Sequence, residues 1–374
     1  MVLLAFRNLF YDKIRSIVTI IGIVFSVVLS SIQLGLFVGF QAATASIVEN
    51  SNADLWISAQ NLVSVENGAA FSERKLYKVL STPNVAEATK NIVQFGTWKR
   101  PDGAETGVEI VGFDLKSEML RPWNMIEGSW EALREPNAVV VDALYKEKLG
   151  VSRIGETVEI RGYKARIVGF THGIRTFTTS PAVFTSFKNA QDYFGLGENQ
   201  TLFILVKAAP NTDLQHLKSD LQTNIADVDV YTRQEITAKQ QNYWMFGTGA
   251  GITVLIAAGL GLLVGVVVVA QTIYSATVDH IKEYGTLKAM GATNFYLYRV
   301  IIVQALTAGV IGYALAIGLS LFISFGSLQG TTAIIIPWQL AVGLFGLTML
   351  MCAAASVVSI NKVTRLDPAM VFKG

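Results

Sequence analysis

The side chains that most often carry out catalysis or bind metals are few and widely separated in this sequence. Its three histidines, His172, His216 and His280, are far apart, and its single cysteine, Cys352, lies in a run without charges. No HExxH motif or paired Cys/His spacing occurs, so a zinc site is not expected. No Gly-Lys dipeptide occurs either, which excludes a phosphate-binding loop of the G-x-x-x-x-G-K-[ST] kind. We therefore expect no catalytic, metal or cofactor-binding residues in this chain.

The densest polar segment is a short island of mixed charge, DHIKEYGTLKAMGAT, at Asp279–Thr293. It follows a run, 240–278, that has no Asp, Glu, Lys or Arg. As a helix it would place four apolar side chains three residues apart, in a row that drifts around the helix axis: Ile281, Tyr284, Leu287 and Met290. Such a row fits a docking helix that is touched on more than one side. A solvated loop whose charges only fix the topology explains the pattern equally well.

The composition surrounding this island is that of a membrane protein. The chain is 51% hydrophobic and 16% charged, and its mean hydropathy is +0.43. The charges are segregated, because the runs 17–40, 240–278 and 300–361 contain none. These runs are long enough to cross a bilayer as helices. No ionisable residue lies in them, so a proton path through buried carboxylates is not expected.

The three uncharged runs predict four crossings. The first run fits one retained helix, although Ala43-Thr44-Ala45 also resembles the cleavage site of a signal peptide. The last run is too long for one helix and is interrupted at 326–332 and by Pro337, so it predicts a hairpin of two. Before the first span, Leu3, Phe6, Phe10 and Ile14 recur at helical spacing. They predict an amphipathic helix on the membrane surface or a solvated start of the first span.

The distribution of Lys and Arg predicts the orientation of the spans. These residues precede the first span, occur in the island and follow the last span, whereas the connection after the third span has none. Both termini and the island are therefore expected in the cytoplasm. About 200 residues remain outside, with 21 Lys and Arg against 24 Asp and Glu, which is not a nucleic-acid-binding surface. Trp244 and Trp338 are expected at the outer membrane interface.

The outer segment alternates strand and helix patterns, so we expect an α+β domain. Strands are predicted at ADLWIS, GVEIVGF, NAVVV, TLFILVKA and DVDVYT, and a hairpin around Gly162-Tyr163. Helices are predicted at SERKLYKVL, at DALYKEKLG, which closes on Gly150, and at TDLQHLKSDLQTNI. From Thr232 a helical pattern continues without a breaker into the second span and predicts a rigid stalk.

The predicted fold is a membrane protein with four transmembrane α-helices and a large α+β extracytoplasmic domain inserted between helices 1 and 2. The predicted parts in chain order are a cytoplasmic interfacial helix (1–15), transmembrane helix 1 (16–40), the outer domain (41–240), the stalk with transmembrane helix 2 (241–278), a cytoplasmic segment (279–298), transmembrane helix 3 (299–326), an outer loop (327–336), transmembrane helix 4 (337–361) and a cytoplasmic tail (362–374).

Small residues at four-residue spacing predict close helix packing in the second span. Gly261 and Gly265 form one such pair, and Gly247 and Gly251 form another. Chance is an equally good explanation, since the chain has 32 glycines.

Four stretches of the sequence resemble one family. KEYGTLKAMGA (282–292), followed by LYRVIIVQAL, resembles the cytoplasmic coupling segment of MacB/LolC/FtsX-type ABC transporter permeases, especially of the DevC-like branch. AFRNLFYDKIRSIVTIIGI (5–23) resembles the family's entry into its first span. LGVSRIGETVEIRGYKARIVGF (149–170) resembles a stretch of its periplasmic domain, and TRLDPAMVFKG (364–374) resembles its ending.

The resemblance implies a homodimer in the bacterial inner membrane, with ATP bound by a separate ABC ATPase subunit. It also implies a membrane-fusion adaptor protein and, in double-membrane bacteria, a TolC-like outer-membrane channel, with membrane lipid around the spans. ATP-driven closure of the ATPase pair would push on the coupling segment and move the outer domain. The residues that the resemblance assigns to this coupling are Lys282, Glu283, Tyr284, Gly285, Leu287, Lys288, Met290 and Gly291.

Three functions fit this resemblance. The first is export of a lipophilic or amphipathic compound as part of a tripartite efflux pump. The second is signalling of the FtsX kind, in which the outer domain activates a cell-wall hydrolase. The third is release of lipoproteins of the LolC kind. An adaptor gene beside an ATPase gene would favour export, and a hydrolase gene would favour signalling.

Overall fold

The computed structural model describes residues 13–176, 180–279, 285–286, 288 and 290–364. The chain divides into two compact units. We call Met1–Gly39 with Ile252–Ser327 and Ala333–Gly374 the helical unit, and Phe40–Gly251 with Leu328–Thr332 the sheet domain. The amphipathic helix predicted before Lys13 and the tail after Thr364 lie outside the described residues.

Four long helices carry the predicted membrane spans. They are α2 (Lys13–Glu49), α8 (Ala250–Asp279), α10 (Asn294–Ser327) and α11 (Trp338–Thr364). Each contains a window that is long and apolar enough to cross a membrane, and these windows were found among the described residues alone. The hairpin prediction is confirmed, because α10 ends within the predicted interruption and α11 begins directly after Pro337.

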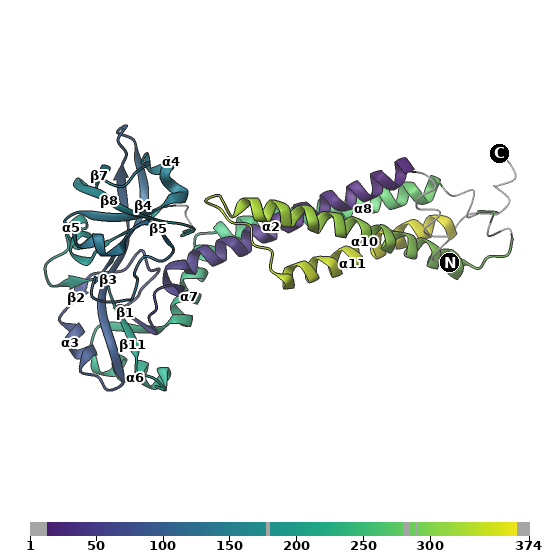
Figure 1. Cartoon of the computed structure of the whole chain (residues 1–374). Helices are drawn as coiled ribbons and strands as arrows, with labels where there is room; N and C mark the ends of the chain where they lie inside the picture. Colours follow the sequence, from purple (N-terminus) through teal and green to yellow (C-terminus); the bar gives the residue numbers. More distant parts are fainter. Residues whose placement is uncertain (1–12, 177–179, 280–284, 287, 289, 365–374) are drawn as a thin grey trace. The chain divides into compact units, whose positions relative to one another are not determined.

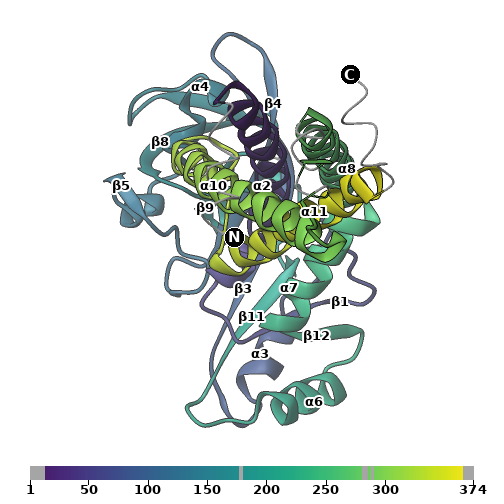
Figure 2. The same ribbon diagram turned by 90° about the vertical axis from the view of Figure 1, so that its right-hand side faces the viewer.

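Inside the helical unit, the helices run alongside one another (Figures 1 and 2). Their shared core consists of small and aliphatic side chains: Ile23, Val27, Val269, Ala305, Ala308, Ala316, Met351, Cys352 and Ala355. Large apolar side chains such as Phe322 and Phe325 face outward instead, with 75% and 72% of their surface exposed. This inversion is expected of a bundle whose solvent is lipid, because apolar burial does not drive helices together there.

The sheet domain is built on one sheet of ten strands in the order β12-β1-β11-β3-β4-β9-β6-β8-β5, with β7 beside β3 and β8. The strands are β1 (Leu55–Ala59), β3 (Val85–Lys99), β4 (Glu105–Phe113), β5 (Met125–Gly128), β6 (Ala138–Asp142), β7 (Thr157–Ile160), β8 (Tyr163–Thr171), β9 (Ala182–Ser186), β11 (Phe203–Ala208) and β12 (Val228–Thr232). A separate pair joins β2 (Phe71–Ser72) to β10 (Gln200–Thr201).

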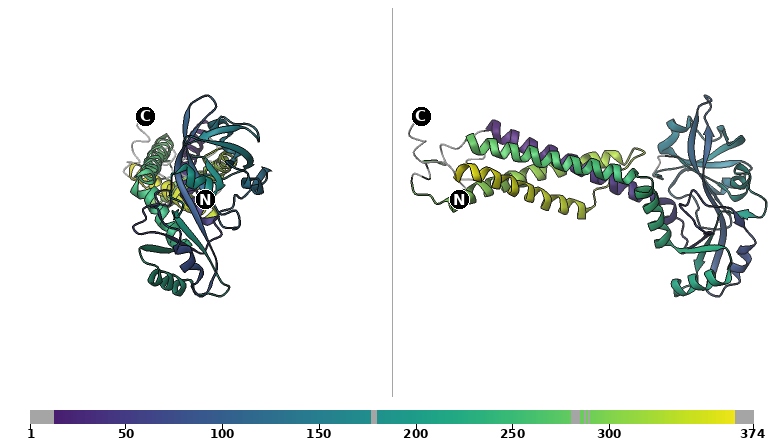
Figure 3. Two further views of the ribbon diagram at one scale, coloured as in Figure 1. Left: turned by 90° about the vertical axis from the view of Figure 1, so that its left-hand side faces the viewer. Right: turned by 180° about the vertical axis from the view of Figure 1, so that it is seen from behind.

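The long strand β3 connects two parts of this sheet (Figure 3). Its first half pairs with β11, and its second half pairs with β4 and, at Trp98 and Lys99, with β7. Because β7 also pairs with β8, the strands β3, β4, β9, β6, β8 and β7 form a closed ring. The ring surrounds the larger hydrophobic core, whereas the strands on the other side of β3 pack on a smaller one.

Short helices cover the sheet of this domain. They are α3 (Lys75–Leu80), η1 (Trp130–Arg134), η2 (Ala143–Tyr145), α4 (Lys146–Leu149), α5 (Phe187–Tyr193), α6 (Leu214–Asn224), α7 (Arg233–Asn242) and the π-helical turn η3 (Tyr243–Gly247). The predicted α+β character is confirmed. Asp213 caps α6 by accepting from the amide of Gln215 at 2.9 Å, and Gly150 closes α4 in the left-handed conformation.

The expectation of an unbroken helical stalk from Thr232 is wrong. The helix α7 ends at Asn242 and continues as the π-helical turn η3. The chain then bends at Gly249, whose φ is +78°, before α8 begins. Only a residue without a Cβ adopts this conformation readily, so the break is encoded by a glycine that the helical pattern concealed.

Trp244 and Trp338, both expected at the outer membrane interface, lie in different surroundings. Its indole lies within the sheet domain, where it packs edge-to-face on Phe95 with ring centroids 5.9 Å apart. Trp338, by contrast, begins α11 and is 72% exposed. The contact with Phe95 favours packing within the sheet domain as the role of Trp244, and its position at a membrane interface stays a prediction.

Candidate coupling site

The described part of the chain contains four of the predicted coupling residues, Gly285, Lys288, Met290 and Gly291. The other four, Lys282, Glu283, Tyr284 and Leu287, lie outside the described residues. A helical turn is present around Thr286, whose carbonyl accepts the amide of Met290 at 3.0 Å. The side chain of Met290 is 72% exposed.

This turn ends at a glycine that the backbone requires. The amide of Gly291 donates to the carbonyl of Lys288 at 3.0 Å, and its φ is +94°. A Cβ at this position would meet no atom within 4 Å, so the conformation and not the space selects glycine. Thr293 then starts α10, because its Oγ1 accepts the amide of Tyr296 at 3.3 Å. The described residues of the segment thus form a helical turn that ends at Gly291, shortly before the third span.

The predicted packing glycines behave in two different ways. A Cβ on Gly265 would lie 1.7 Å from Oγ of Ser26, and one on Gly261 would lie 3.2 Å from Leu29, so both face α2. Gly247 and Gly251 face their own turn instead: their nearest atoms belong to Tyr243 and to Met245. The geometry therefore supports helix packing at Gly261 and Gly265 but offers no second helix at the other pair.

The helix α2 makes further close contacts within the helical unit. A Cβ on Gly312 of α10 would lie 2.6 Å from Ile23 of α2. The extended segment before α11 also lies against α2, since Ile335 donates its amide to the carbonyl of Gly35 at 3.0 Å. The first span is therefore in contact with the second, with the third and with the segment leading into the fourth.

A buried polar cluster joins the two chain segments that enter and leave the sheet domain. Glu66 accepts a hydrogen bond from Nε1 of Trp244 at 3.1 Å and another from the amide of Gln240. Oε1 of Gln240 accepts in turn from the backbone amide of Val65 at 2.9 Å. At the end of α2, the carbonyl of Gln41 accepts from Nε2 of Gln241 at 3.3 Å. The last turns of α2, the loop at Glu66 and the end of α7 are thereby tied together.

A second carboxyl group, that of Glu109 on β4, lines the same small cavity as Glu66, Phe95 and Trp244. Burial raises the pKa of Glu109 well above its ordinary value, and the neighbouring Glu66 raises it further. Burial also raises the pKa of Glu66, although its hydrogen bonds act in the opposite direction. The surroundings of the two carboxyl groups therefore favour their protonated form. No sequence motif marks this pair, because the two residues are far apart in the chain.

Comparison with known proteins agrees with this architecture. The family described as "MacB-like periplasmic core domain" matches residues 16–224, which is more than half of the chain, and "FtsX-like permease C-terminal" matches residues 242–368. The chain therefore belongs to the MacB/FtsX-type ABC transporter permeases. It is a multi-pass membrane protein, and most of its sheet domain lies within the residues that match the MacB-like periplasmic core domain.

Individual relatives are similar over most or part of the chain. An uncharacterised ABC transporter permease of Methanocaldococcus jannaschii is 22% identical over 99% of this chain and 96% of its own length. The permease YknZ of Bacillus subtilis is 25% identical over 58% of this chain and 56% of its own length. The macrolide export ATP-binding/permease protein MacB of Escherichia coli is 23% identical over 98% of this chain and 59% of its own length.

Solved structures are similar to the sheet-rich part of the chain as well, among them the following two. The periplasmic region of MacB from Actinobacillus actinomycetemcomitans covers 51% of this chain and 94% of its own, with 12% identity and a TM-score of 0.40. The extracellular domain of the transporter YknZ covers 48% of this chain and 99% of its own, with 14% identity and a TM-score of 0.36.

Proposed function

We propose that this chain is the permease subunit of an ABC-type exporter, and that it transmits ATP-driven motion from a separate ATPase subunit to its sheet domain. The exported compound is lipophilic or amphipathic. The working unit is a homodimer in the inner membrane with both termini in the cytoplasm. A membrane-fusion adaptor, and in double-membrane bacteria an outer-membrane channel, completes the path.

The observation that carries this proposal is the pair of family matches, which cover nearly the whole chain in order. The sequence contains no phosphate-binding loop, and this supports the proposal that ATP is hydrolysed by a separate subunit. The Escherichia coli relative is a macrolide export protein, which supports export over the other functions.

The fold supports transmission by movement of whole elements. The helix α2 is continuous from the first span into the sheet domain, and its last turns are tied to α7 through Gln41 and Gln241. In the described parts of the four spans, the apolar windows hold at most two charged residues each, which offers no charged substrate path. We therefore expect a force on the coupling segment to act by moving the sheet domain and not by opening a substrate path among the helices.

A double variant of the coupling segment tests the proposal. Glu283→Ala with Leu287→Asp should abolish transport and the stimulation of the partner ATPase, while the protein still inserts into the membrane. The matched control is Glu159→Ala with Leu80→Asp, which makes the same chemical changes at exposed positions of the sheet domain. Full export by the coupling variant would refute the role of the segment.

The partners are tested separately by copurification from the native membrane, followed by mass spectrometry of proteins and bound lipids. An ABC ATPase together with an adaptor is the expected result. A cell-wall hydrolase without an adaptor would replace export with signalling, and a chain purified without any ATPase would overturn the proposal as a whole.

A further inference from the structure

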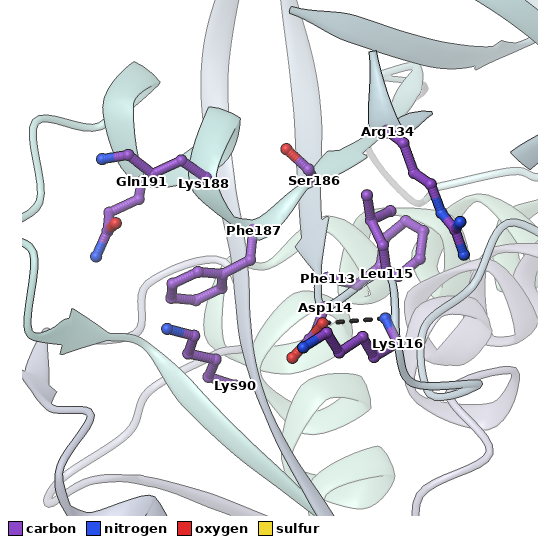
Figure 4. Close-up of a pocket in the computed structure, with 10 residues that line it drawn as sticks. All are labelled: Lys90, Phe113, Asp114, Leu115, Lys116, Arg134, Ser186, Phe187, Lys188 and Gln191. Atoms are coloured by element: carbon purple, nitrogen blue, oxygen red, sulfur yellow. Dashed lines mark hydrogen bonds between the residues drawn. The ribbon is translucent and has the colours of Figure 1, made fainter. Parts of the chain in front are cut away.

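The sheet domain contains an open cleft of about 560 Å³ at the end of a parallel strand pair (Figure 4). The strands β4 and β9 run in the same direction, and their last paired residues are Phe113 and Ser186. The cleft lies at the carboxyl ends of these two strands and is bounded by α5, η1 and β3. Clefts in this position of mixed sheets often bind ligands, and the volume is within the range of small-molecule sites.

The inner wall of the cleft is apolar. Phe113 is fully buried and Phe187 is 6% exposed, so their rings belong to the core, and Leu115 packs against the same core. In Figure 4 these three side chains occupy the middle of the cleft. Such a wall can accept a hydrocarbon segment without losing hydrogen bonds.

The rim of the cleft is cationic. Four basic side chains line it, against the single carboxylate of Asp114: Lys90, Lys116, Arg134 and Lys188. In Figure 4, Lys90 and Lys188 lie on one side of the apolar residues and Arg134 on the other. This concentration is notable because the outer segment as a whole carries more acidic than basic residues.

Two of these four basic side chains form ion pairs with neighbouring acidic residues, and two do not. Lys90 pairs with Glu73 at 2.7 Å, and Lys188 pairs with Asp192 at 2.8 Å. Among the described residues, Lys116 and Arg134 form no ion pair within 4.0 Å, although the charge of Arg134 contributes to lowering the pKa of Glu131. Both side chains are exposed, and each places a positive charge on a long side chain at the opening of the cleft.

We propose that this cleft binds a single-chain anionic amphiphile, with its hydrocarbon chain on Leu115 and Phe187 and its head group between Lys116 and Arg134. This ligand is selected by the combination of an apolar wall and cations without ion-pair partners. A neutral lipid would form no ion pair with the cations, and a small free anion would leave the apolar wall exposed to water. The binding does not depend on the proposed export function.

The test uses the full chain in a neutral sugar detergent and a diazirine-bearing dodecyl phosphate as the probe. After photolysis, we expect the label in peptides that contain 113–116 and 186–191. The zwitterionic phosphocholine analogue with the same chain is the head-group control, and we expect it to label these peptides several-fold less.

Charge-reversal variants at the exposed rim keep the core intact. Lys116→Glu with Arg134→Glu should reduce labelling by the phosphate probe several-fold. Lys99→Glu with Lys164→Glu makes the same charge change at a different surface of the domain and should leave labelling unchanged. Labelling confined to the spans, or equal labelling by both probes, would overturn the inference. Cleft labelling in a chain that exports nothing would leave it intact and count only against the proposed function.

Discussion

Nε1 of Trp244 donates a hydrogen bond to Oε2 of Glu66 across 3.1 Å, and this bond joins the exit of the sheet domain to a loop near its entrance. The side-chain amide of Gln240 donates a second hydrogen bond to the same carboxyl group, which also interacts with the hydroxyl group of Ser64. Trp244 and Gln240 both belong to the segment that leads into α8. Movement of that segment relative to the sheet must therefore break hydrogen bonds to a buried acid.

Replacement of this donor should destabilise the sheet domain. In Trp244→Phe an aromatic ring remains, but the buried carboxyl group loses one donor, and a lost bond to a charged group costs about 1–3 kcal/mol. We expect the free energy of unfolding, measured by denaturant titration of the full chain, to fall by that amount. Trp338→Phe is the control, because Trp338 is 72% exposed. Equal stability of the two variants would contradict the role of the bond.

The buried pair of acids predicts an unusual dependence of stability on pH. Since burial raises the pKa of Glu109 above its ordinary value of 4.5, the folded state binds the proton more tightly than the unfolded state. The resulting stability is fully present below the ordinary pKa and is lost as the pH rises through the raised value. Glu66, which faces Glu109, adds a shift in the same direction.

The variant Glu109→Gln removes this dependence because the amide stays neutral. We expect it to melt at a higher temperature than the original chain at neutral pH and to lose this advantage near about pH 4, where the carboxyl group is protonated. Thermal melts across this range measure the difference. Glu105→Gln, at the exposed start of the same strand, should show no such crossover. A destabilising effect of Glu109→Gln at neutral pH would show that the charged form is the one the fold requires.

Close packing of α2 and α8 makes Gly265 intolerant of a methyl group. A Cβ would lie 1.7 Å from Oγ and 2.7 Å from Cβ of Ser26, so one helix must shift, at a cost of about 1–3 kcal/mol. We expect Gly265→Ala to lower the melting temperature of the full chain in detergent. Gly259→Ala is the matched control, since a Cβ at Gly259 meets nothing within 4 Å.

A compensating change separates packing from other effects of the glycine. Ser26→Gly removes both atoms that the new methyl group would strike, so the double variant with Gly265→Ala should recover most of the lost stability. If the second change does not help, the contact between these helices is not the reason for the glycine.

The sequence predicts the parts of this protein in which one physical signal dominates. Charge-free runs reveal the spans, because no soluble core requires so many uncharged residues in succession. Glycine at a left-handed position reveals the ends of α4 and of the coupling turn. At Gly249 this signal is concealed, because the surrounding residues favour a helix and only the left-handed conformation of one glycine breaks it.

Features that arise from long-range pairing were missed. Strand β3 was not predicted, although it is the longest strand, because it borders different neighbours along its length and shows no regular alternation of buried and exposed residues. The pair formed by Glu66 and Glu109 is a product of that topology as well. Neither a pattern of spacing nor a local motif can reveal two acids that meet only after the sheet has formed.

The loop between α10 and α11 gives the last prediction. Nε of Arg175 donates to the carbonyl of Gly330 at 3.0 Å, and another guanidinium nitrogen donates to the carbonyl of Leu328, so one side chain of the sheet domain holds residues 328–332. Hydrogen bonds from a charged donor contribute about 1.5–3 kcal/mol each. Arg175→Ala should therefore raise the rate of amide hydrogen exchange in 328–332 by about tenfold or more, as measured by mass spectrometry. Arg153→Ala is the control, because 86% of that side chain is exposed. Unchanged exchange in the Arg175 variant would mean that this loop is held by contacts other than the guanidinium.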